Sequence, residues 1–475
     1  MQTSVVNYKE LNSELRIDAE YYRAEVLNRI NLLGKKDNKM LGDIASFFIG
    51  PFGSTVTVDQ YVDKSDYRYV RNKDINDFLI DDDDPAFVPE NVYKSLPQYH
   101  IKECDILITV VGTLGKAAIA LIKDTYSIFS CKSTLIRTRK IDPYYLLTYL
   151  NSNVGQLFAL RGTRGAIQLG LNLIDLKEIK VFIPSIYFQE KIRKIIISSF
   201  NLVDEAKDLY IQAEQILLSE LGLLDWKPKH QLSFVRNYSD TESAERIDAE
   251  YFQPIYEELM KAIISSGCYN CLGDLVSIKK CVEPGSEAYQ DSGIPFVRVS
   301  NLSKFSINDN NQQFLSSELY ETLKQYQPKK NEILLSKDAT PGIAYYLKDD
   351  PSKMIPSGGI LRLSIKDREK IIPEYLTLVL NSVIVQKQVE RDIGGSIIDH
   401  WLVDQVKNTL VPILPINKQQ EISNTINESF CSREKSRQLL EIAKHGVEIA
   451  IEETEEKAED LIDKEIKALG ITLDE

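Results

Sequence analysis

Histidine is scarce in this chain of 475 residues. The four histidines are His100, His230, His400 and His445, and none lies in a recurring motif. Because histidine is the side chain that most often transfers protons near neutral pH, acid–base catalysis has little support. Each histidine is interpreted as an ordinary surface or core residue.

Cysteine is also sparse. The six cysteines are scattered along the chain, at positions 104, 131, 268, 271, 281 and 431. Scattered cysteines indicate a reduced, cytoplasmic setting rather than a disulfide framework. Cys268, Cys271 and Cys281 have partial zinc spacing, but no fourth ligand lies nearby and the first half of the chain has no equivalent, so no metal site is predicted.

Long hydrophobic runs are missing too. No apolar run approaches the ~18–20 residues that span a bilayer, and residues 1–5 lack the pattern of a signal peptide. The hydrophobic fraction of 43% is nevertheless enough for real cores. The chain length favours roughly two to four domains.

Familiar catalytic motifs are matched poorly. Asp142-Pro-Tyr-Tyr145 and Asp84-Pro-Ala-Phe87 resemble the Asp/Asn-Pro-Pro-aromatic motif of amino-methyltransferases, but both lack the second proline and are interpreted as turns. Gly112-Thr-Leu-Gly-Lys116 superficially resembles a phosphate loop, but it lacks the spacing and the following Ser or Thr. The sequence therefore predicts no catalytic residue.

Positive charge is in deficit, with a net charge of −13, which argues superficially against nucleic acid as a partner. The deficit is local, however. Residues 448–475 hold eleven Asp or Glu and three Lys, and the run Asp81–Asp84 adds four more acids. The rest of the chain is close to neutral, so it has room for local basic faces, which only a structure can reveal.

The chain does contain an extended internal repeat. Arg16-Ile-Asp-Ala-Glu-Tyr-Tyr22 returns as Arg246-Ile-Asp-Ala-Glu-Tyr-Phe252. Further matches follow in the same order with nearly the same offset, including Leu41-Gly-Asp-Ile44 with Leu272-Gly-Asp-Leu275, Val70-Arg71 with Val297-Arg298, Gly115 with Gly342, Leu150-Asn-Ser152 with Leu380-Asn-Ser382, and Gln189-Glu190 with Gln420-Glu421. The chain is thus two copies of one module, in which shared residues serve the scaffold or a shared partner and differing residues are free to carry different specificities.

Each module shows the same order of predicted elements. A short helix at the Arg-Ile-Asp-Ala-Glu-Tyr site, capped by Asp18 or Asp248, precedes short β-type runs broken by Gly, Pro and Asn. A helix follows from Pro143 to about Arg161, or from Pro373 to about Arg391, with proline near its first turn. A glycine-containing loop, a strand and a long helix complete the module.

The long helices, expected near 188–224 and 420–466, carry weak heptads. Seven-residue spacing joins Ile196, Val203, Tyr210, Leu217 and Leu224 in the first helix and Ile426, Leu440, Val447 and Leu461 in the second, with alanines 206, 213, 443 and 450 at complementary positions. Arg433 and Thr454 interrupt the second seam. Small inner residues favour close approach of two antiparallel helices; the alternative is that each helix packs on its own domain alone.

Together these motifs resemble the specificity (S) subunit of Type I restriction–modification systems over essentially the whole chain. The first copy supplies Gly50-Pro-Phe-Gly-Ser54, Tyr69-Val-Arg-Asn72, Gly112-Thr-Leu-Gly115, Leu169-Gly-Leu-Asn-Leu173 and Ile183-Pro184 with Gln189-Glu-Lys-Ile192. The second supplies Pro284-Gly-Ser286, Phe296-Val-Arg298, Gly394-Gly-Ser-Ile397 and Leu414-Pro415 with Gln420-Glu-Ile422. The second copy lacks the Gly-Pro-Phe-Gly-Ser loop, which fits a different recognition surface.

The resemblance implies an α/β (α+β) protein with two target recognition domains related by a pseudo-twofold repeat and separated by two long antiparallel helices. The domains would be residues 1–185 and 231–416, the spacer helices residues 186–230 with a linker and 417–475 with an acidic tail. Such subunits read the two halves of a split double-stranded DNA site and have no catalysis or cofactor of their own. They recruit two modification subunits, which methylate adenine with S-adenosylmethionine, and restriction subunits that use ATP and Mg²⁺.

Two groups of residues are candidates for the binding surfaces. The predicted DNA contacts are Ser54, Thr55, Arg71, Asn72, Lys73, Arg164 and Gln168 in the first copy and Ser286, Tyr289, Arg298, Ser300, Asn301 and Lys304 in the second. The shared Arg71 and Arg298 suit phosphate contact or a structural bond, whereas the residues that differ suit base edges. The repeated motif is the candidate docking site for the modification subunits, through Arg16, Asp18, Glu20, Arg246, Asp248 and Glu250; the alternative is a purely structural turn.

Three other functions remain open from sequence alone. The nearest is an S-like recognition subunit of another bipartite methylation or phage-defence complex. A stand-alone DNA methyltransferase or nuclease is the enzyme alternative, and methylation by the purified chain would establish it. An acidic interaction scaffold is the third, and residues 448–475 are its main support.

Overall fold

The computed structural model describes residues 6, 11, 16–19, 21–164, 169–309, 311–393 and 400–473, with only the backbone described at Arg164. The chain divides into two compact units. Unit 1 combines residues 1–203 with 434–475, and unit 2 comprises residues 204–433. In the described part of the chain, no helix has both the length and the apolar character needed to cross a membrane.

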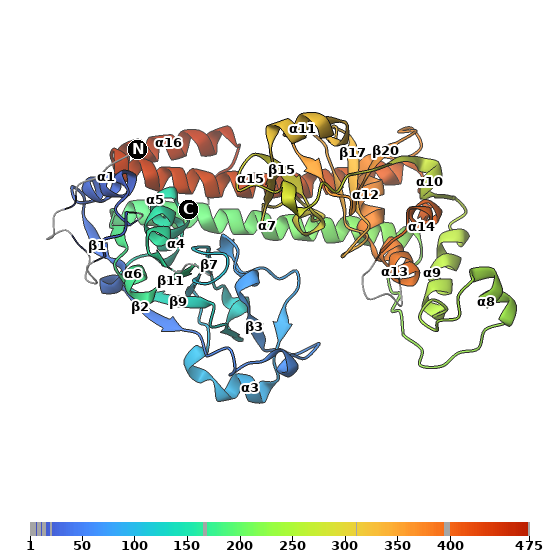
Figure 1. Ribbon diagram of the computed structural model, residues 1–475, viewed down its shortest axis with the longest axis horizontal. Coiled ribbons are helices and arrows are strands. Elements are labelled where there is room, and N and C mark those ends of the chain that lie inside the picture. Colours follow the sequence, from blue (N-terminus) through green and yellow to red (C-terminus); the bar gives the residue numbers. More distant parts are fainter. Residues whose placement is uncertain are drawn as a thin grey trace. The chain divides into compact units, whose positions relative to one another are not determined.

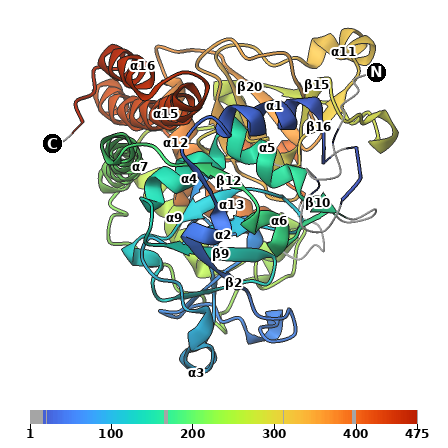
Figure 2. The same ribbon diagram turned by 90° about the vertical axis from the view of Figure 1, so that its left-hand side faces the viewer.

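Unit 1 contains a mixed sheet of five strands in the order β2 (Ala45–Ile49), β9 (Ser133–Thr138), β6 (Ile106–Thr109), β7 (Ala117–Ile119) and β4 (Phe78–Leu79). A second sheet has the order β5 (Ala86–Phe87), β3 (Arg68–Val70) and β8 (Ser127–Phe129). Helix α4 (Pro143–Asn151) packs on β7 and β4, beside α5 (Asn153–Arg161) (Figure 2). The central strands β6 and β7 are buried throughout, as β-branched and small apolar residues in a covered sheet should be.

Unit 2 repeats this arrangement. Its larger sheet has the order β14 (Val276–Lys280), β20 (Ile360–Ile365), β17 (Glu332–Ser336) and β18 (Ala344–Tyr346). Its smaller sheet has the order β16 (Gln313–Leu315), β15 (Ile294–Val297) and β19 (Ile355–Pro356), and α12 (Pro373–Asn381) packs on β18. The predicted fold class of two tandem α/β modules, each followed by a long helix, is confirmed.

Residues kept in both copies hold equivalent joints of the scaffold. Asn151 donates from its amide to the carbonyl of Ala117 at 2.9 Å, and Asn381 does the same to Ala344 at 2.8 Å, so each pins a helix to a strand of the larger sheet. Gln189 and Gln419 each donate to a backbone oxygen just before a long helix, at 3.0 and 2.9 Å. The structural counterpart of Gln189 in the second module is therefore Gln419, and the predicted pairing with Gln420 is wrong by one residue.

The predicted single helices after Pro143 and Pro373 are each two helices. The break falls at Ser152 in the first module and at Ser382 in the second, where α13 (Val383–Ile393) begins. The Ser152 hydroxyl accepts a hydrogen bond from Gly155 N at 3.2 Å, which caps the start of α5. Periodicity continued across this cap, so it did not reveal the break.

The long helices α7 (Ile186–Glu220) and α15 (Ile416–Glu452) pair in antiparallel fashion within each unit. In unit 1 the Ser199 hydroxyl donates to the carbonyl of Ser436 at 3.2 Å, and in unit 2 the Ser429 hydroxyl donates to the carbonyl of Ala206 at 2.6 Å. The inner alanines 206, 213, 443 and 450 are all fully buried, as predicted. Leu224 lies beyond the end of α7 and is 51% exposed, so it is not part of the seam.

The second long helix ends earlier than predicted. Instead of continuing to residue 466, α15 stops at Glu452, and a separate helix, α16 (Glu455–Ala468), doubles back along it (Figure 1). The hydroxyl of Thr454 caps α16 by accepting from Lys457 N at 3.3 Å. A Cβ at Gly446 would lie 2.5 Å from Ile462, so this glycine permits close approach of α16. Leu461, which the heptad had placed on the long helix, belongs to α16.

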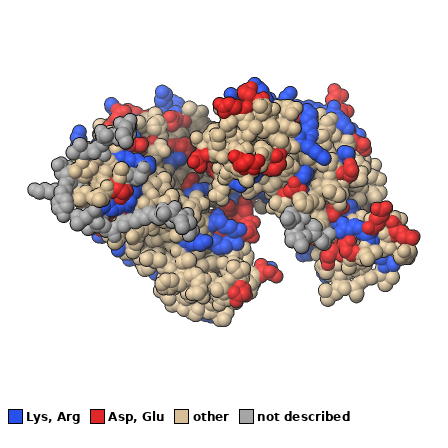
Figure 3. All heavy atoms as spheres, in the orientation of Figure 1, with Lys and Arg blue, Asp and Glu red and all other residues tan. Residues whose placement is uncertain are grey.

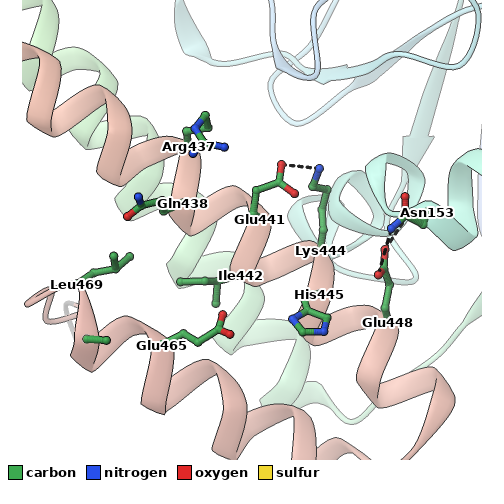
Figure 4. Close-up of a pocket in the computed structure, with 11 residues that line it drawn as sticks. Asn153, Arg437, Gln438, Glu441, Ile442, Lys444, His445, Glu448, Glu465 and Leu469 are labelled. Atoms are coloured by element: carbon green, nitrogen blue, oxygen red, sulfur yellow. Dashed lines mark hydrogen bonds and ion pairs between the residues drawn. The ribbon is translucent and has the colours of Figure 1, made fainter. Parts of the chain in front are cut away.

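A groove of about 630 Å³ lies between α15, α16 and the start of α5 (Figure 4). On its wall, the carboxylate of Glu448 accepts from the backbone N of Asn153 at 2.7 Å and thereby caps α5. Glu441 and Lys444 form an ion pair at 2.6 Å. The Glu448–Asn153 contact fastens the last part of α15 to the first module, whereas the Glu441–Lys444 pair lies within α15.

Candidate nucleic-acid interface

In the first module, several polar loops meet at one edge of the two sheets. Strands β3 and β8 are parallel, so their carboxyl ends lie side by side. Arg71 follows β3, and Ser130 follows β8. The loop after β6 joins them, because Val110 N donates to the Lys132 carbonyl at 2.9 Å, and Leu171 N to the Val110 carbonyl at 2.9 Å. Three of the seven predicted DNA contacts of this module, Arg71, Asn72 and Lys73, follow the end of β3.

Arg71 is held firmly at this edge. Its Nε and Nη2 donate to the two oxygens of Asp74 at 3.1 and 2.9 Å, and its backbone N also donates to Asp74, at 2.8 Å. Burial alone would lower the pKa of this guanidinium, but the bonds to Asp74 raise it. The Arg71 side chain remains 21% exposed.

The acidic run Asp81–Asp84 lies against the basic side chains of this edge. Asp84 pairs with Lys73 and Arg71, and Asp82 pairs with Arg68 and Lys123. The hydrogen bond from Lys73 holds the pKa of Asp84 below its ordinary value. The run therefore neutralises cations that a polyanion would otherwise meet.

The Gly50-Pro-Phe-Gly-Ser54 loop is the most exposed part of this edge. Ser54 and Thr55 are exposed, and Phe52 is 86% exposed. A Cβ at Gly50 would lie 2.2 Å from the Ser130 carbonyl, so only glycine lets the loop approach the end of β8.

Three predicted contacts of this module are not seen as exposed side chains. Asn72 is half-buried, and its Oδ1 has no hydrogen-bond partner. Arg164 lies in β10 (Thr163–Arg164), which pairs with β11 (Gly170–Leu171) beside the loop after β6, but its side chain lies outside the described part. Gln168 lies outside the described residues altogether.

The second module builds the same edge with different groups. Arg298 follows β15 as Arg71 follows β3, and its backbone N donates to the Asn301 side chain at 3.1 Å. Its Nη2 donates to the Asn311 carbonyl at 2.5 Å, whereas its Nε is buried and has no hydrogen-bond partner.

One predicted DNA contact in this module is corrected by the structure. Asn301 is fully buried, because it occupies the position of Asp74 and closes the turn after the strand. Its side chain faces the interior, so Asn301 has a structural position rather than a DNA-facing one. The sequence comparison had matched the two arginines but not the residues three positions later.

The other predicted contacts in this module are spread more widely. Ser286 and Ser300 are exposed, and the Tyr289 hydroxyl reaches Glu283 at 3.4 Å. Lys304 lies instead against the long helix, with Nζ 5.0 Å from the ring centroids of both Tyr210 and Phe305. Lys304 is therefore placed apart from the arginine turn.

Sequence reasoning missed a charged cluster in the second module. Asp338 accepts from Lys337 Nζ at 2.5 Å and lies 2.8 Å from His400 Nδ1. Burial alone would raise the pKa of Asp338, but these two neighbours lower it. A Cβ at Gly359, just after β19, would lie 3.4 Å from Asp338, which places the cluster at the same edge as Arg298. His400 is 62 residues from Asp338 in the chain, so no sequence motif could join them.

The described surface shows charges of both signs. On the face seen in Figure 3, basic and acidic side chains are interspersed over both modules, without a broad area of one sign. The local basic positions are thus accompanied by acids, as the near-neutral charge of the chain outside its acidic segments predicts.

Comparison with known proteins matches both modules to one family. The family is described as Type I restriction modification DNA specificity domain, and it matches residues 34–215 and again residues 269–431. Two matches in one chain correspond to the two structural modules. The chain belongs to this family. It is a non-catalytic protein of DNA sequence recognition.

Individual relatives of this specificity protein are distant. A putative type I restriction enzyme MjaX specificity subunit from Methanocaldococcus jannaschii is 23% identical over 408 residues, which cover 82% of this chain and 88% of that protein. The S subunit structure from M. genitalium has 12% identity and a TM-score of 0.36, covering 90% of this chain and 95% of that one. The HsdS subunit from Thermoanaerobacter tengcongensis has 13% identity and a TM-score of 0.27, covering 90% and 96%.

The repeated motif of this specificity protein forms a turn rather than the predicted helix. Asp18 Oδ1 accepts from Tyr21 N at 3.1 Å, and Asp248 Oδ1 accepts from Tyr251 N at 3.1 Å. The following helices, α1 (Ala24–Leu33) and α9 (Pro254–Ser265), begin only afterwards. The predicted aspartate caps thus exist, but each closes a turn.

In both modules an arginine pairs with the aspartate of the turn and lies over the tyrosine ring. We call this set of three residues the clasp. Arg16 pairs with Asp18 at 2.7 Å and lies 4.4 Å over the Tyr21 ring; Arg246 pairs with Asp248 at 2.7 Å and lies 4.5 Å over the Tyr251 ring. Burial raises the pKa of Tyr21 to about 12. Four of the six predicted docking residues are therefore engaged within the turn. Of the other two, Glu250 is exposed and Glu20 lies outside the described residues.

Proposed function

We propose that each module reads one half of a bipartite double-stranded DNA site through the loops at its sheet edge. The observation that carries this proposal is the duplicated arginine turn: a strand ends in Arg71 or Arg298, and a residue three positions later closes the turn at 2.8 or 3.1 Å. Both arginines are half-buried, and an arginine shared by both modules suits phosphate contact. The surrounding loops differ between the modules, which suits different half-sites.

Within this proposal the base-reading residues are the exposed ones that differ. In the first module they are Ser54, Thr55 and Lys73, with Asn72 at the margin. In the second they are Ser286, Ser300 and His400, with the half-buried Lys337 beside His400 on Asp338. Such side chains can match donors and acceptors on base edges in the major groove.

The long helices act, in this proposal, as the ruler between the half-sites. A heptad inserted into both helices at facing positions would add ~10 Å at ~1.5 Å per residue, or about three base pairs at ~3.4 Å each. The hydrogen bond between Ser429 and Ala206 identifies these as facing positions, whereas Ala443 lies elsewhere on the seam.

Methylome sequencing tests both parts together. Cells carrying the insertions after Ala206 and Ser429 should methylate a site with unchanged half-sites and a gap longer by about three base pairs. A matched control carries the heptad in α7 alone and should lose methylation, because the seam is broken. Unchanged spacing in an active double insertion would contradict the ruler.

The partners in this proposal are two modification subunits and the restriction subunits of the same system. Family membership supports an assembly of this kind, and S-adenosylmethionine, ATP and Mg²⁺ would act in those subunits. Purified chain alone should bind DNA without methylating it. Methyl transfer by the chain alone would overturn the proposal.

A further inference from the structure

The repeated turn presents one side chain outward in both modules. Its Arg, Asp and Tyr are engaged with one another, whereas Ile17 is 87% exposed and Ile247 is 89% exposed. The same residue thus has the same near-complete exposure in two modules whose surfaces have otherwise diverged. An isoleucine this exposed buries too little apolar area to stabilise the fold of its module.

Other exposed apolar residues do not show this two-copy pattern so fully. Ile122 is 71% exposed, but the corresponding position of the second module is Asp349. Ile186 and Ile416 correspond to each other and are 62% and 52% exposed, but they form the first turns of α7 and α15. Ile17 and Ile247 are more exposed and lie outside helices, on turns that the clasp holds rigid.

The second module adds apolar surface beside its turn. Leu232, Val235 and Tyr238 are 97%, 94% and 75% exposed. The rings of Tyr251 and Phe252 line a groove of about 590 Å³ between α8 (Tyr238–Ala244) and α9. Large exposed apolar side chains near such a groove are typical of protein contacts. The sequence counterparts of Val235 and Tyr238 in the first module are Val5 and Tyr8, outside the described residues.

We infer that Ile17 and Ile247 are two equivalent docking points, each inserted into an apolar pocket on one copy of the modification subunit. Two identical features on one chain fit a partner that binds twice, and the inference rests on the proposed assembly with two such subunits. DNA is a poor occupant, because Arg16 and Arg246 are each neutralised by an aspartate at 2.7 Å and nucleic acid selects cations.

In this arrangement the modification subunit meets the isoleucine of the motif, not its charged residues. Arg16, Asp18 and their counterparts act as positioning residues that fix the backbone of the turn. Ile17 and Ile247 make the contact. An apolar anchor on a rigid turn loses little freedom on binding, which favours its use as an interface hot spot.

Native mass spectrometry of the full chain mixed with the modification subunit of the same system tests this inference. Ile17→Asp should lose one of two bound subunits, Ile247→Asp the other, and the double variant both. Affinity at each altered point should fall at least about tenfold. Ile17→Ser and Ile247→Ser should act in the same direction, and all variants should melt at the temperature of the unchanged chain. Ile122→Asp is the matched control and should keep both subunits.

The outcomes separate this inference from the proposed function. If the unchanged chain binds two subunits and the folded double variant also binds two with unchanged affinity, the docking inference is overturned and the assembly stands. If the unchanged chain binds no modification subunit, the proposed assembly fails, and the inference fails with it. Binding of DNA by the double variant should be unaltered in either case.

Discussion

The two modules carry corresponding loops, of which the first is strongly acidic and the second is nearly neutral. Residues 80–87 begin with Ile and end with Phe, as do residues 307–314, but the four central aspartates of the first loop correspond to Asn-Asp-Asn-Asn in the second. The backbone contact is retained, because Nη2 of Arg71 donates to the Asp84 carbonyl and that of Arg298 to the Asn311 carbonyl. Geometry has been conserved while charge has changed.

The residue that closes the arginine turn differs in the same sense. Asp74 accepts three bonds from Arg71 with its two oxygens. The Asn301 side chain accepts the backbone N of Arg298, whose Nε is left without a partner. Arg71 is therefore bound within an acidic setting, whereas the described acceptors at Arg298, Asn301 and Asn311, are neutral. We expect the second module to hold DNA with more of its cationic charge available.

This contrast should persist across the neutral pH range. Burial by itself would raise the pKa of Asp82, but Lys123 and Arg68 lower it, and the pKa of Asp84 is lowered mainly by Lys73. A lowered carboxyl pKa means that these ion pairs are intact above the ordinary value of 3.8 and are lost only as pH falls through the lowered value. Near neutrality the aspartates stay charged.

The largest expected effect is a loss of stability when the arginine of an ion pair is removed. Such a pair lies in each module, and the two arginines differ in exposure. Arg362 is 2% exposed and pairs with Glu332 at 2.7 Å, whereas Arg137 is 23% exposed and pairs with Asp105 at 2.6 Å. Arg362→Met should lower the free energy of unfolding by about 3–5 kcal/mol, because it strands a buried carboxylate. Arg137→Met also strands a buried carboxylate, because Asp105 is 1% exposed, but it should cost less, since the position of the more exposed arginine can open to water. Urea unfolding of both variants checks the order; equal losses would remove this difference between the modules.

The next effect concerns half-site specificity. Lys73→Ala should alter recognition of one half-site only, and Ser300→Ala, at the corresponding position, should alter only the other. A true base contact should cost ~1–3 kcal/mol against its preferred base. Methylome sequencing of cells with each variant shows which half-site relaxes. If either change affected both halves, the modules would not read DNA separately.

The acidic loop Asp81–Asp84 should weaken DNA binding, by less than the loss of a base contact would. Asp81→Asn with Asp84→Asn makes the first loop resemble the second, and we expect DNA affinity at low salt to rise about tenfold, or ~1.4 kcal/mol, with a steeper salt dependence. The reciprocal change, Asn308→Asp with Asn311→Asp, should reduce affinity. Fluorescence anisotropy of the assembled complex measures both. Affinity that ignores both exchanges would show that these loops do not face DNA.

The smallest expected effect separates the two arginines. Arg298→Ala should flatten the salt slope of DNA binding by about one unit. Arg71→Ala should flatten it less, because Asp74 and Asp84 already neutralise that guanidinium, and should instead lower thermal stability. The same anisotropy titrations over a salt series, with melting curves, provide the measurement. Equal slopes for the two variants would mean that the acids do not compete with DNA.

The sequence predicts the features that both copies share, but it does not predict features that depend on how a turn or a helix end is placed in three dimensions. The repeat identified the modules, because joints such as Asn151 and Asn381 must be the same in both copies. It could not separate the buried Asn301 from its exposed neighbours, since that needed the register of the turn. Thr454 interrupted the heptad in the sequence, but only the structure shows that α16 turns back there.

The docking residues illustrate the same limit. Identity between the copies selected the right motif, and the charged residues looked like its contacts. Only the clasp, with Arg16 4.4 Å over Tyr21, shows that they face one another. Equally, an isolated β-bridge brings His400 to Asp338 from a segment far along the chain, a relation that no local pattern encodes.

The composition of unit 1 from both ends of the chain has a consequence for biosynthesis. Residues 204–433 form a continuous segment, whereas unit 1 needs residues 434–475 to complete a core that began with the first module. On the ribosome, the copy that is translated second can therefore finish folding first. The first copy must wait, with the surface that receives Leu439, Val447 and Ile462 uncovered, until the last helices emerge.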